Sequence, residues 1–313
     1  MGATWRTAER EDGEALAAFL GREEYRCVEG SETAREVWLR GNAEFSRGGL
    51  FVHHSGVARR VSSINGMVLL RRGGSCYCIL PGGVPDGVDV DDADLARTLR
   101  IWGTVRGLFG ERSDLCRIQR LVAADFVEER DYLLMTRRPE CDGGPAGFPK
   151  AGEPSSRSFR RPPALRCAAV ARDDLVIREA GWEDWRVLCT LHGEYLNEEL
   201  QLPVDASRDT VGKKAGALLK FQRVLLAFKD GKPVGKANTN ARGLSADQIG
   251  GVYVRPEFRG NGIAGAIVGL LADTIRACGR RCVLYVRPEN TAARRVYEKL
   301  DFEVAGTYRA VYY

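Results

Sequence analysis

The sequence lacks any long hydrophobic segment. Its 313 residues contain no stretch of about 18 uncharged apolar residues, the length that a membrane-spanning helix needs. The first residues, Met1-Gly2-Ala3-Thr4-Trp5-Arg6, form no apolar signal core and place Arg where a myristoylation site needs Ser or Thr. We therefore expect a cytoplasmic protein with no membrane partner.

Residues that commonly bind metals are few or badly spaced. The three histidines are His53, His54 and His192, and the nine cysteines are scattered and odd in number. Cys76-Tyr77-Cys78 would place two sulfurs on one face of a strand, but a zinc site needs a second pair of ligands at a suitable spacing. We expect reduced thiols and no metal cofactor.

An excess of charge of one sign is also missing. Lys and Arg total 47 and Asp and Glu total 42, which gives a formal net charge of +5. This weak and diffuse charge argues against a nucleic-acid partner. Hydrophobic residues make up 44% of the chain and charged residues 28%, as in ordinary globular proteins.

Proline marks a division of the chain. Six of the 12 prolines lie between Pro139 and Pro163, with Gly and Ser between them. Such a segment cannot bury enough apolar area to offset the entropy of ordering it. We expect one domain over 1–138, a linker over 139–164 and a second domain over 165–313, because a domain has roughly 100–200 residues.

The hydrophobic pattern of the second domain predicts the element order β-α-α-β-β-β-α-β-α-β. The expected ranges are 175–178, 182–200, 207–221, 223–228, 233–240, 248–254, 262–278, 282–286, 291–300 and 303–313.

The first domain repeats this order faintly, without a repeat at the level of residues. Helices are expected near 7–20, 32–39 and 93–108, a short helical piece near 122–129, and strands near 50–53, 64–70, 75–80, 115–118 and 132–136. The shared order predicts an α/β (α+β) protein that arose by duplication of one unit.

A glycine-rich turn in the second domain carries the chemistry. In the stretch 252–265, VYVRPEFRGNGIAG, a strand ends, a turn follows and a helix begins. Backbone amides at such a turn point outward at the positive end of a helix, where a pyrophosphate can bind. An ordinary strand–helix turn is the alternative. The dinucleotide fingerprint G-x-G-x-x-G is absent.

Two motifs here resemble those of the GNAT acyltransferases. Residues 259–264, RGNGIA, match R/Q-x-x-G-x-G/A, and residues 290–302, NTAARRVYEKLDF, resemble N-x-x-A-x-x-x-Y-x-x-x-G-F. The resemblance covers about 165–313. Asp301 replaces the Gly of the second motif, and we expect the turn to survive because Asp tolerates left-handed backbone. The layout also resembles a bacterial group in which a degenerate GNAT-like domain precedes an active one.

The resemblance implies tandem GNAT-like folds, each with a mixed, mostly antiparallel sheet flanked by helices, and acetyl-CoA as the co-substrate. The backbone of Val252 and Val254 would bind pantetheine, and the Val254 amide would face the thioester oxygen. The residues implied in coenzyme binding are Val252, Tyr253, Val254, Arg259, Gly260, Asn261, Gly262, Ile263, Ala264, Gly265 and Asn290.

The catalytic groups are less completely determined. Tyr297 is the candidate general acid for the leaving thiolate, or else a packed aromatic residue. Asn290 either binds the pantetheine arm or caps a helix. Asp247 and Glu194 are candidate bases, as are Glu198 and Glu199, and a solvated helix face is the alternative for the glutamates. Arg294 and Arg295 either meet CoA phosphates or are plain surface charge.

The resemblance therefore implies an N-acyltransferase that transfers acetyl to a primary amine, on a small molecule, a peptide N-terminus or a lysine. The alternatives are an acyl-CoA sensor or scaffold without turnover and an aminoacyl-tRNA-dependent ligase. The first domain would supply part of the acceptor cleft or the surface of a homodimer.

Overall fold

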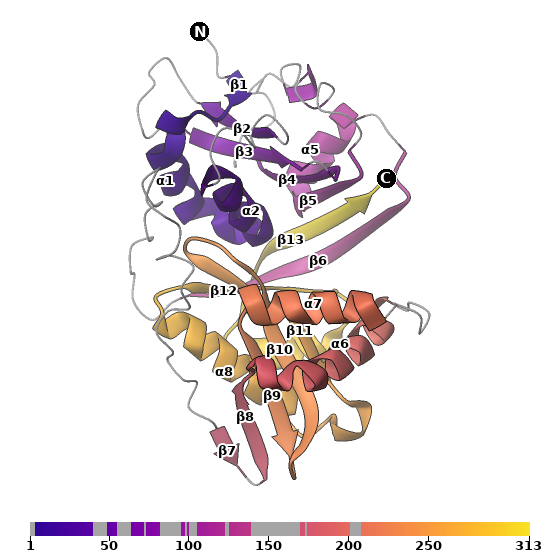
Figure 1. The fold of residues 1–313 in the computed structure, drawn as a ribbon. Helices are drawn as coiled ribbons and strands as arrows, with labels where there is room; N and C mark the ends of the chain where they lie inside the picture. Colours follow the sequence, from indigo (N-terminus) through magenta and orange to yellow (C-terminus); the bar gives the residue numbers. More distant parts are fainter. Residues whose placement is uncertain are drawn as a thin grey trace.

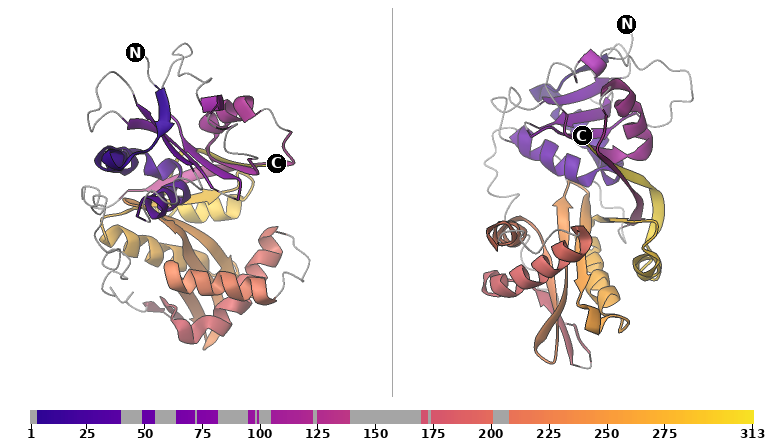
Figure 2. Two further views of the ribbon diagram at one scale, coloured as in Figure 1. Left: turned by 45° about the horizontal axis from the view of Figure 1, so that its top comes forward. Right: turned by 90° about the vertical axis from the view of Figure 1, so that its right-hand side faces the viewer.

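The computed structural model describes residues 4–39, 49–54, 64–71, 73–81, 95–97, 99, 105–122, 125–138, 170–172, 174–200 and 208–313. Their strands form a single 13-stranded sheet with helices on both faces (Figures 1 and 2). Among the described strands, only the pairs β4–β5 and β11–β12 run parallel. The predicted fold class, a mixed and mostly antiparallel sheet flanked by helices, is confirmed.

Apart from an additional first strand that was not predicted, Val170–Arg172, the C-terminal half follows the predicted order, and each expected boundary agrees to within two residues. Its elements are β7 (Val170–Arg172), β8 (Leu175–Glu179), the 3-10 helix η3 (Trp182–Asp184), α6 (Trp185–Leu200), α7 (Arg208–Phe221), β9 (Val224–Lys229), β10 (Lys232–Arg242), β11 (Ala246–Val254), η4 (Pro256–Phe258), α8 (Ile263–Ala277), β12 (Arg281–Val286), α9 (Thr291–Glu298) and β13 (Glu303–Tyr312).

The N-terminal half has a similar order of elements. They are β1 (Thr4–Thr7), η1 (Arg10–Asp12), α1 (Gly13–Glu23), η2 (Glu24–Arg26), α2 (Val28–Leu39), β2 (Gly49–His54), β3 (Ile64–Leu70), β4 (Ser75–Ile79), β5 (Gly107–Glu111), α5 (Arg112–Val122) and β6 (Glu128–Arg137).

Two predictions for this half are wrong. The expected strand 115–118 belongs to helix α5, where Leu115 and Ile118 lie one turn apart and are both fully buried. Of the expected helical piece 122–129, the described residues include only the last residue of α5, the non-helical residues 125–127 and the start of strand β6. Of the expected helix 93–108, the described residues 95–97 and 99 are helical, the end is strand β5, and most of the rest lies outside the described residues.

The two halves exchange strands at the centre of the sheet, where the order is β5-β13-β6-β12. Strand β6 pairs with β12 from Leu133↔Val286 to Arg137↔Cys282, and β13 pairs with β5 from Tyr308↔Glu111 to Tyr312↔Gly107. Figure 1 shows both strands running between the upper and lower parts of the molecule. Each half therefore completes the sheet of the other. The boundary at 138/165 stays a prediction, and the linker 139–164 lies outside the described residues.

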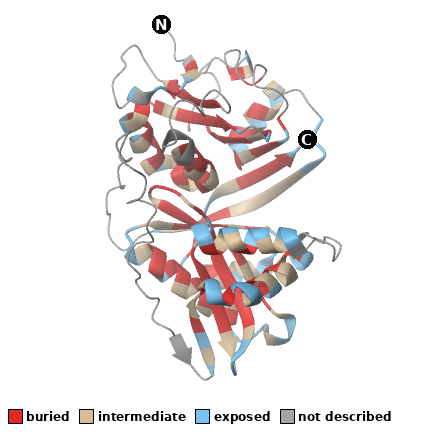
Figure 3. Cartoon of the chain, in the orientation of Figure 1, coloured by how far each residue is buried: buried red, intermediate tan, exposed pale blue. Residues whose placement is uncertain are grey.

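Apolar packing also crosses between the halves. One buried cluster joins Leu16 and Leu20 of α1 to Leu244, Val283 and Tyr308 of the C-terminal half. Figure 3 shows the strands of both halves largely buried, with exposed residues on the outer faces of the helices. The two halves therefore share part of one hydrophobic core.

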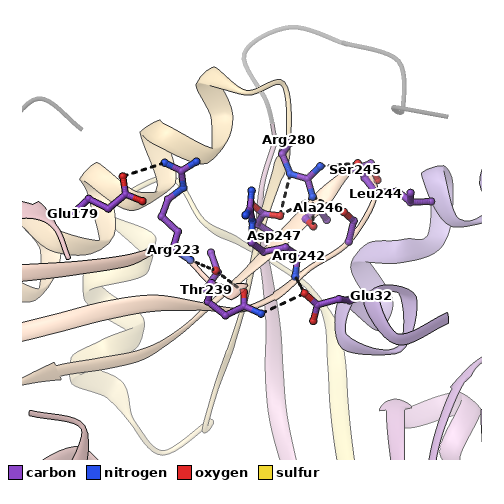
Figure 4. Close-up of polar contacts among 12 residues, drawn as sticks. Glu32, Glu179, Arg223, Thr239, Arg242, Leu244, Ser245, Ala246, Asp247 and Arg280 are labelled. Carbon is purple, nitrogen blue, oxygen red and sulfur yellow. Dashed lines mark hydrogen bonds and ion pairs between the residues drawn. The ribbon is translucent and has the colours of Figure 1, made fainter. Parts of the chain in front are cut away.

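Polar contacts reinforce this interface at the turn between β10 and β11. The buried carboxylate of Glu24 accepts hydrogen bonds from the amides of Leu244, Ser245 (2.6 Å) and Ala246 (2.8 Å) and from the Ser245 hydroxyl (2.8 Å). Nearby, Glu32 of α2 accepts a 3.0 Å hydrogen bond from the Arg242 amide (Figure 4). Carboxylates of the N-terminal half therefore bind the turn mainly through hydrogen bonds from its backbone amides.

A repeat at the level of residues is present after all, at the start of each half. Arg6 donates two hydrogen bonds to Asp12, at 2.7 and 2.6 Å, and Arg178 donates two to Asp184, both at 2.7 Å. Each aspartate also accepts from a backbone amide three residues earlier. The shared pattern R-x-A-x-x-E-D, 172 residues apart, escaped the sequence analysis.

Candidate functional site

The two central strands of the C-terminal half part from each other. Parallel pairing of β11 with β12 runs from Ala246↔Arg281 to Ile249↔Leu284 and goes no further. Beyond this point Val252, Tyr253 and Val254 line a cavity of about 550 Å³. That volume lies in the range of small-molecule sites. A strand edge freed from its neighbour offers backbone groups to a ligand.

Most of the residues predicted to bind coenzyme meet in this cavity. Besides the strand residues it is lined by Arg259, Gly260, Gly262, Ile263, Ala264, Gly265, Asn290 and Tyr297. The sequence motifs around 259–264 and 290–302 thus supply two walls of one space.

The amides of the glycine turn are free. None of the backbone N–H groups from Gly260 to Gly265 donates to an acceptor in the described part of the chain, and the first helical bond of α8 is Ala266 N to Gly262 O, 3.0 Å. Gly260 and Gly262 have φ of 81° and 73°, which glycine adopts at no steric cost. Free amides at a helix N-terminus are suited to bind an anion.

Two side chains of the turn contact the protein itself: that of Arg259, which also lines the cavity, and that of Asn261, which does not. Arg259 donates to the Val254 carbonyl (2.8 Å) and to Glu198 (2.6 Å), so its guanidinium ties the turn back to β11 and α6. Asn261 is exposed, is not a lining residue, and donates its side-chain amide to the carbonyls of Phe258 and Arg259. The structure supports a bracing function for both side chains.

Tyr297 is a buried lining residue, 8% exposed, on α9. No hydrogen bond joins its hydroxyl to another residue that the structure describes. Burial, followed by the negative charge of Glu199, raises the pKa of Tyr297 to about 12. The phenol is therefore neutral at ordinary pH, and its hydroxyl has no partner within the described protein.

Asn290 and Asp301 bound the second motif. The Asn290 side chain accepts a hydrogen bond from the Ala293 amide (3.0 Å), so this residue caps α9 while also lining the cavity. Asp301 has φ of 60°. The expectation that Asp would adopt the left-handed turn of the replaced Gly is confirmed.

Two of the predicted bases lie away from the cavity. Asp247 is buried and bound by Arg280 at 2.6 Å (Figure 4). Glu194 accepts two hydrogen bonds from Arg255, at 3.0 and 2.8 Å. Neither is a lining residue, and each carboxylate is held by an arginine that does not line the cavity either. The structure does not support either as a base.

Glu198 and Glu199 of α6 do line the cavity. Glu198 is paired with Arg259, whereas Glu199 forms a 3.2 Å ion pair with Arg287. Glu199 also lines a second cavity of about 440 Å³. The other residues of this second cavity are Glu128, Glu129, Arg130, Asp131, Arg287, Pro288 and Glu289. Four of them come from β6, so the N-terminal half forms part of its wall.

Arg294 and Arg295 do not line either cavity. Arg294 lies 3.8 Å from Glu298 one helical turn away and donates to the Pro288 carbonyl (3.2 Å). Among the described residues, no group of three or more His, Cys, Asp or Glu side chains is placed to hold a metal ion. No described helix is long and apolar enough to cross a membrane.

The sequence analysis missed two residues near the cavity. Tyr195 of α6 is a lining residue, and the ammonium of Lys236 lies 4.7 Å from the centre of its ring. Lys236 is fully buried in β10. A lysine placed between Val234 and Ala237 in the middle of strand β10 is the signal that could have drawn attention to it, since lysine is almost never fully buried without a partner.

Comparisons with known proteins agree with this geometry. The family model described as FR47-like protein matches residues 233–311. A solved protein of Drosophila is similar over 100% of this chain and 99% of its own, with a TM-score of 0.62 and 13% identity. A GCN5-related N-acetyltransferase from Sphaerobacter thermophilus is similar over 99% of this chain and 94% of its own, with a TM-score of 0.51 and 17% identity. The chain has the GNAT fold. No curated protein sequence matches it.

Within this GNAT fold, the family match and the cavity coincide. Residues 233–311 contain β10, β11, the glycine turn, α8, β12 and α9. The matched region therefore holds every lining residue of the larger cavity except Tyr195, Glu198 and Glu199.

Proposed function

We propose that this protein is an acyl-CoA-dependent N-acyltransferase that transfers an acetyl group from acetyl-CoA to a primary amine. The observation that carries the proposal is the row of free amides from Gly260 to Gly265 beside the free edge of β11, in one cavity. The amides would bind the pyrophosphate. The free edge, at Val252 to Val254, would hold the pantetheine arm by backbone hydrogen bonds.

The reaction is direct attack. The amine nitrogen forms a bond to the thioester carbonyl carbon, the carbonyl oxygen gains negative charge, and the carbon–sulfur bond then breaks to leave CoA thiolate. A backbone amide of β11, Val254 in our assignment, stabilises the oxyanion. A protonated amine must lose one proton before it attacks and a second as the amide forms. Glu199, paired with Arg287, replaces Asp247 and Glu194 as the candidate base because it lines both cavities.

Tyr297 stabilises the leaving sulfur. A thiol has an unperturbed pKa of about 8.5, whereas burial raises the pKa of Tyr297 to about 12. Complete transfer of the phenolic proton to the thiolate would therefore be unfavourable. A hydrogen bond from the phenol to the sulfur is favourable, and the thiol receives its final proton from the solvent or from the proton released by the amine.

The second cavity is the proposed entrance for the acceptor. Its five carboxylates are partly balanced by arginines: Arg130 pairs with Glu128, Arg287 with Glu199, and Arg309 with both Glu129 and Asp131. The cavity adjoins the first one at Glu199. A protonated amine, on a small molecule or a peptide, suits these charges. The N-terminal half would thus shape the acceptor site through strand β6.

The test uses the full chain and the variant Tyr297→Phe. Calorimetry should detect acetyl-CoA binding to both proteins, with affinities within about threefold. Mass spectrometry with a panel of amines, peptides and aminoglycosides should show acetylation that the variant slows by about 10²-fold, as for the loss of a group acting in the transition state. Absence of acetyl-CoA binding to the parent chain would refute the proposal. Binding without any turnover would support the alternative of an acyl-CoA sensor.

A further inference from the structure

Lys236 is an unusual residue of β10. Its side chain is fully buried, and no carboxylate forms an ion pair with it in the part of the chain that the structure describes. The ammonium donates to the Gly251 carbonyl (2.7 Å) and to the Asn238 side-chain oxygen (3.0 Å), and it lies over the ring of Tyr195. Burial lowers the pKa of Lys236 to about 7. Burying a lysine in this way is costly, so its retention calls for a reason.

The carbonyl that Lys236 binds belongs to an irregularity in β11. The pairing of β10 with β11 changes from Lys236↔Tyr253 to Asn238↔Gly250. One residue of β10 therefore faces two of β11, Gly251 and Val252, as in a β-bulge. Gly251 has φ of 55°. A bulge disrupts the regular ladder locally, and Lys236 supplies a hydrogen bond to the Gly251 carbonyl.

Side chains of β10 fill the space beside these glycines. A Cβ on Gly251 would lie 2.2 Å from the Asn238 oxygen and 2.7 Å from the Lys236 ammonium, and a Cβ on Gly250 would lie 2.1 Å from the Asn240 amide nitrogen. Asn238 is itself fixed, because its amide donates to Asn240 (2.9 Å) and to the Thr239 carbonyl (3.1 Å). The bulge therefore lies against a continuous polar network.

The position of the bulge links this network to the cavity. The last pair between β11 and β12 is Ile249↔Leu284, two residues before Gly251. The lining residues Val252 to Val254 follow immediately. The direction of the free edge of β11 is therefore set at Gly251, whose carbonyl accepts a hydrogen bond from Lys236.

We propose that Lys236 is a positioning residue for coenzyme binding: its ammonium fixes the Gly251 carbonyl against Asn238 and Tyr195, and so orients the free edge of β11 toward the cavity. The inference rests on the proposed function, because that function gives the edge a ligand. It adds a residue that does not itself line the cavity and that acts through the backbone of Gly251.

The titratable side chains that face Lys236 carry no charge near neutral pH. His192 and Tyr195 of α6 face Lys236. The positive charge of Lys214 on α7 also influences the pKa of His192. Burial, with Lys236 and Lys214, lowers the pKa of His192 to about 3, and burial raises that of Tyr195 to about 12. Both are therefore neutral between pH 5 and 9, and Lys236 is the group among them that titrates there.

The experiment compares Lys236→Met with Val234→Ala in the full chain. Val234 is a fully buried residue of the same strand that packs in the cluster under α8. Lys236→Met should weaken acetyl-CoA binding at least tenfold by calorimetry and accelerate amide hydrogen exchange in residues 250–254. Val234→Ala should lower the melting temperature while leaving both quantities within twofold of the parent. Unchanged exchange and affinity in Lys236→Met would overturn the proposal.

A second variant keeps the proposal testable if Lys236→Met does not fold. Asn238→Ala removes one acceptor of Lys236 and should raise exchange in residues 250–254 with about threefold weaker binding. Failure of the proposed function remains distinguishable, because the parent chain would then bind no acetyl-CoA. The exchange measurement on ligand-free protein would still show whether Lys236 orders this edge.

Discussion

Among the described strands, each half of the molecule has one parallel pair, which pairs along most of β4 in the N-terminal half and along less than half of β11 in the C-terminal half. Strand β4 pairs with β5 over four of its five residues, from Ser75↔Gly107 to Cys78↔Gly110. Strand β11 pairs with β12 over only four of its nine residues. Among the described residues, the parallel pair of the C-terminal half thus parts beside a ligand-sized cavity.

The two pairs differ in their local structure. In the N-terminal half Cys78 and Gly110 are still paired at the last described position of the β4–β5 ladder. In the C-terminal half a bulge at Gly251, braced by Lys236, turns β11 away from β12. The fold alone therefore does not make a site. The opening depends on a few residues that redirect one strand.

The strand exchange predicts that the two halves unfold together, and Leu134→Asp tests this most severely. Leu134 is fully buried in β6, where it pairs with Tyr285 and Gly306. A buried carboxylate without a partner should cost more than about 4 kcal/mol. Circular dichroism and intrinsic fluorescence should show a single unfolding transition for both halves of the parent chain. In the variant, the native signals of both halves should be lost.

Val304→Asp is the control, because Val304 of β13 is 55% exposed, and it should change stability by about 0.5 kcal/mol or less. Hydrogen exchange that stayed slow in one half while the other opened would contradict the idea of a shared unit.

The contact of Glu24 with the turn between β10 and β11 should give the next largest effect. Glu24→Ala leaves the buried amides of Leu244 and Ala246 without their acceptor. Each unsatisfied group costs about 1–3 kcal/mol, so urea unfolding should show a loss of about 3 kcal/mol. Glu23→Ala removes a partly exposed partner of Arg26 and should cost about 0.5 kcal/mol. Equal effects of the two changes would count against this contact as the link between the halves.

The C-terminal half should be sensitive to Gly262→Ala. A Cβ on Gly262 would meet no atom within 4 Å, so the effect comes from its φ of 73°. Left-handed backbone costs a non-glycine residue about 1–2 kcal/mol. If the turn relaxes to avoid that strain, calorimetry should show CoA binding about tenfold weaker.

Gly216→Ala is the matched change in helix α7, where a Cβ would also meet nothing. It should raise stability by about 0.5–1 kcal/mol and leave CoA binding unaltered. Weaker binding in Gly216→Ala would show that the assay responds to changes far from the turn.

The repeated arginine–aspartate pair should produce the smallest effects, alike in both halves. The hydrogen bonds of Arg178 lower the pKa of Asp184, and those of Arg6 outweigh the burial that by itself would raise the pKa of Asp12. Carboxylates with lowered pKa values stabilise the fold at pH above about 4, and the benefit is lost as the pH falls through those values.

Asp12→Asn and Asp184→Asn should therefore each cost about 1 kcal/mol or less at pH 7, since the arginines are partly exposed. The loss should shrink in melts at pH 3. A loss that grew on acidification would be inconsistent with this origin.

The C-terminal half could be predicted well because its elements are punctuated by local signals. Asp230 and Gly231 form the expected hairpin turn, both with positive φ. Gly262 precedes α8 and Asn290 caps α9. Such residues act on their own neighbours, so one sequence is enough to locate them.

Features that depend on distant partners were missed. Nothing local to β6 indicates that it will lie between β12 and β13, because the partner residues follow about 145 to 180 positions later. The same holds for the partners of Asp247 and Glu194, whose arginines come from elsewhere in the chain. Lys236 was overlooked because the carbonyl that its ammonium binds belongs to Gly251 of the neighbouring strand. A candidate base can be proposed from its chemistry, but its availability depends on the whole fold.

The exchanged strand β13 also constrains how the chain is made. The N-terminal sheet needs residues 303–312 between β5 and β6, and a ribosome adding about 5–20 residues per second reaches them only some 10–30 s after β6. During that interval the edges of β5 and β6 have no native neighbour, and such edges invite pairing with other chains. Nascent N-terminal segments should accordingly be chaperone clients until synthesis reaches the last strand.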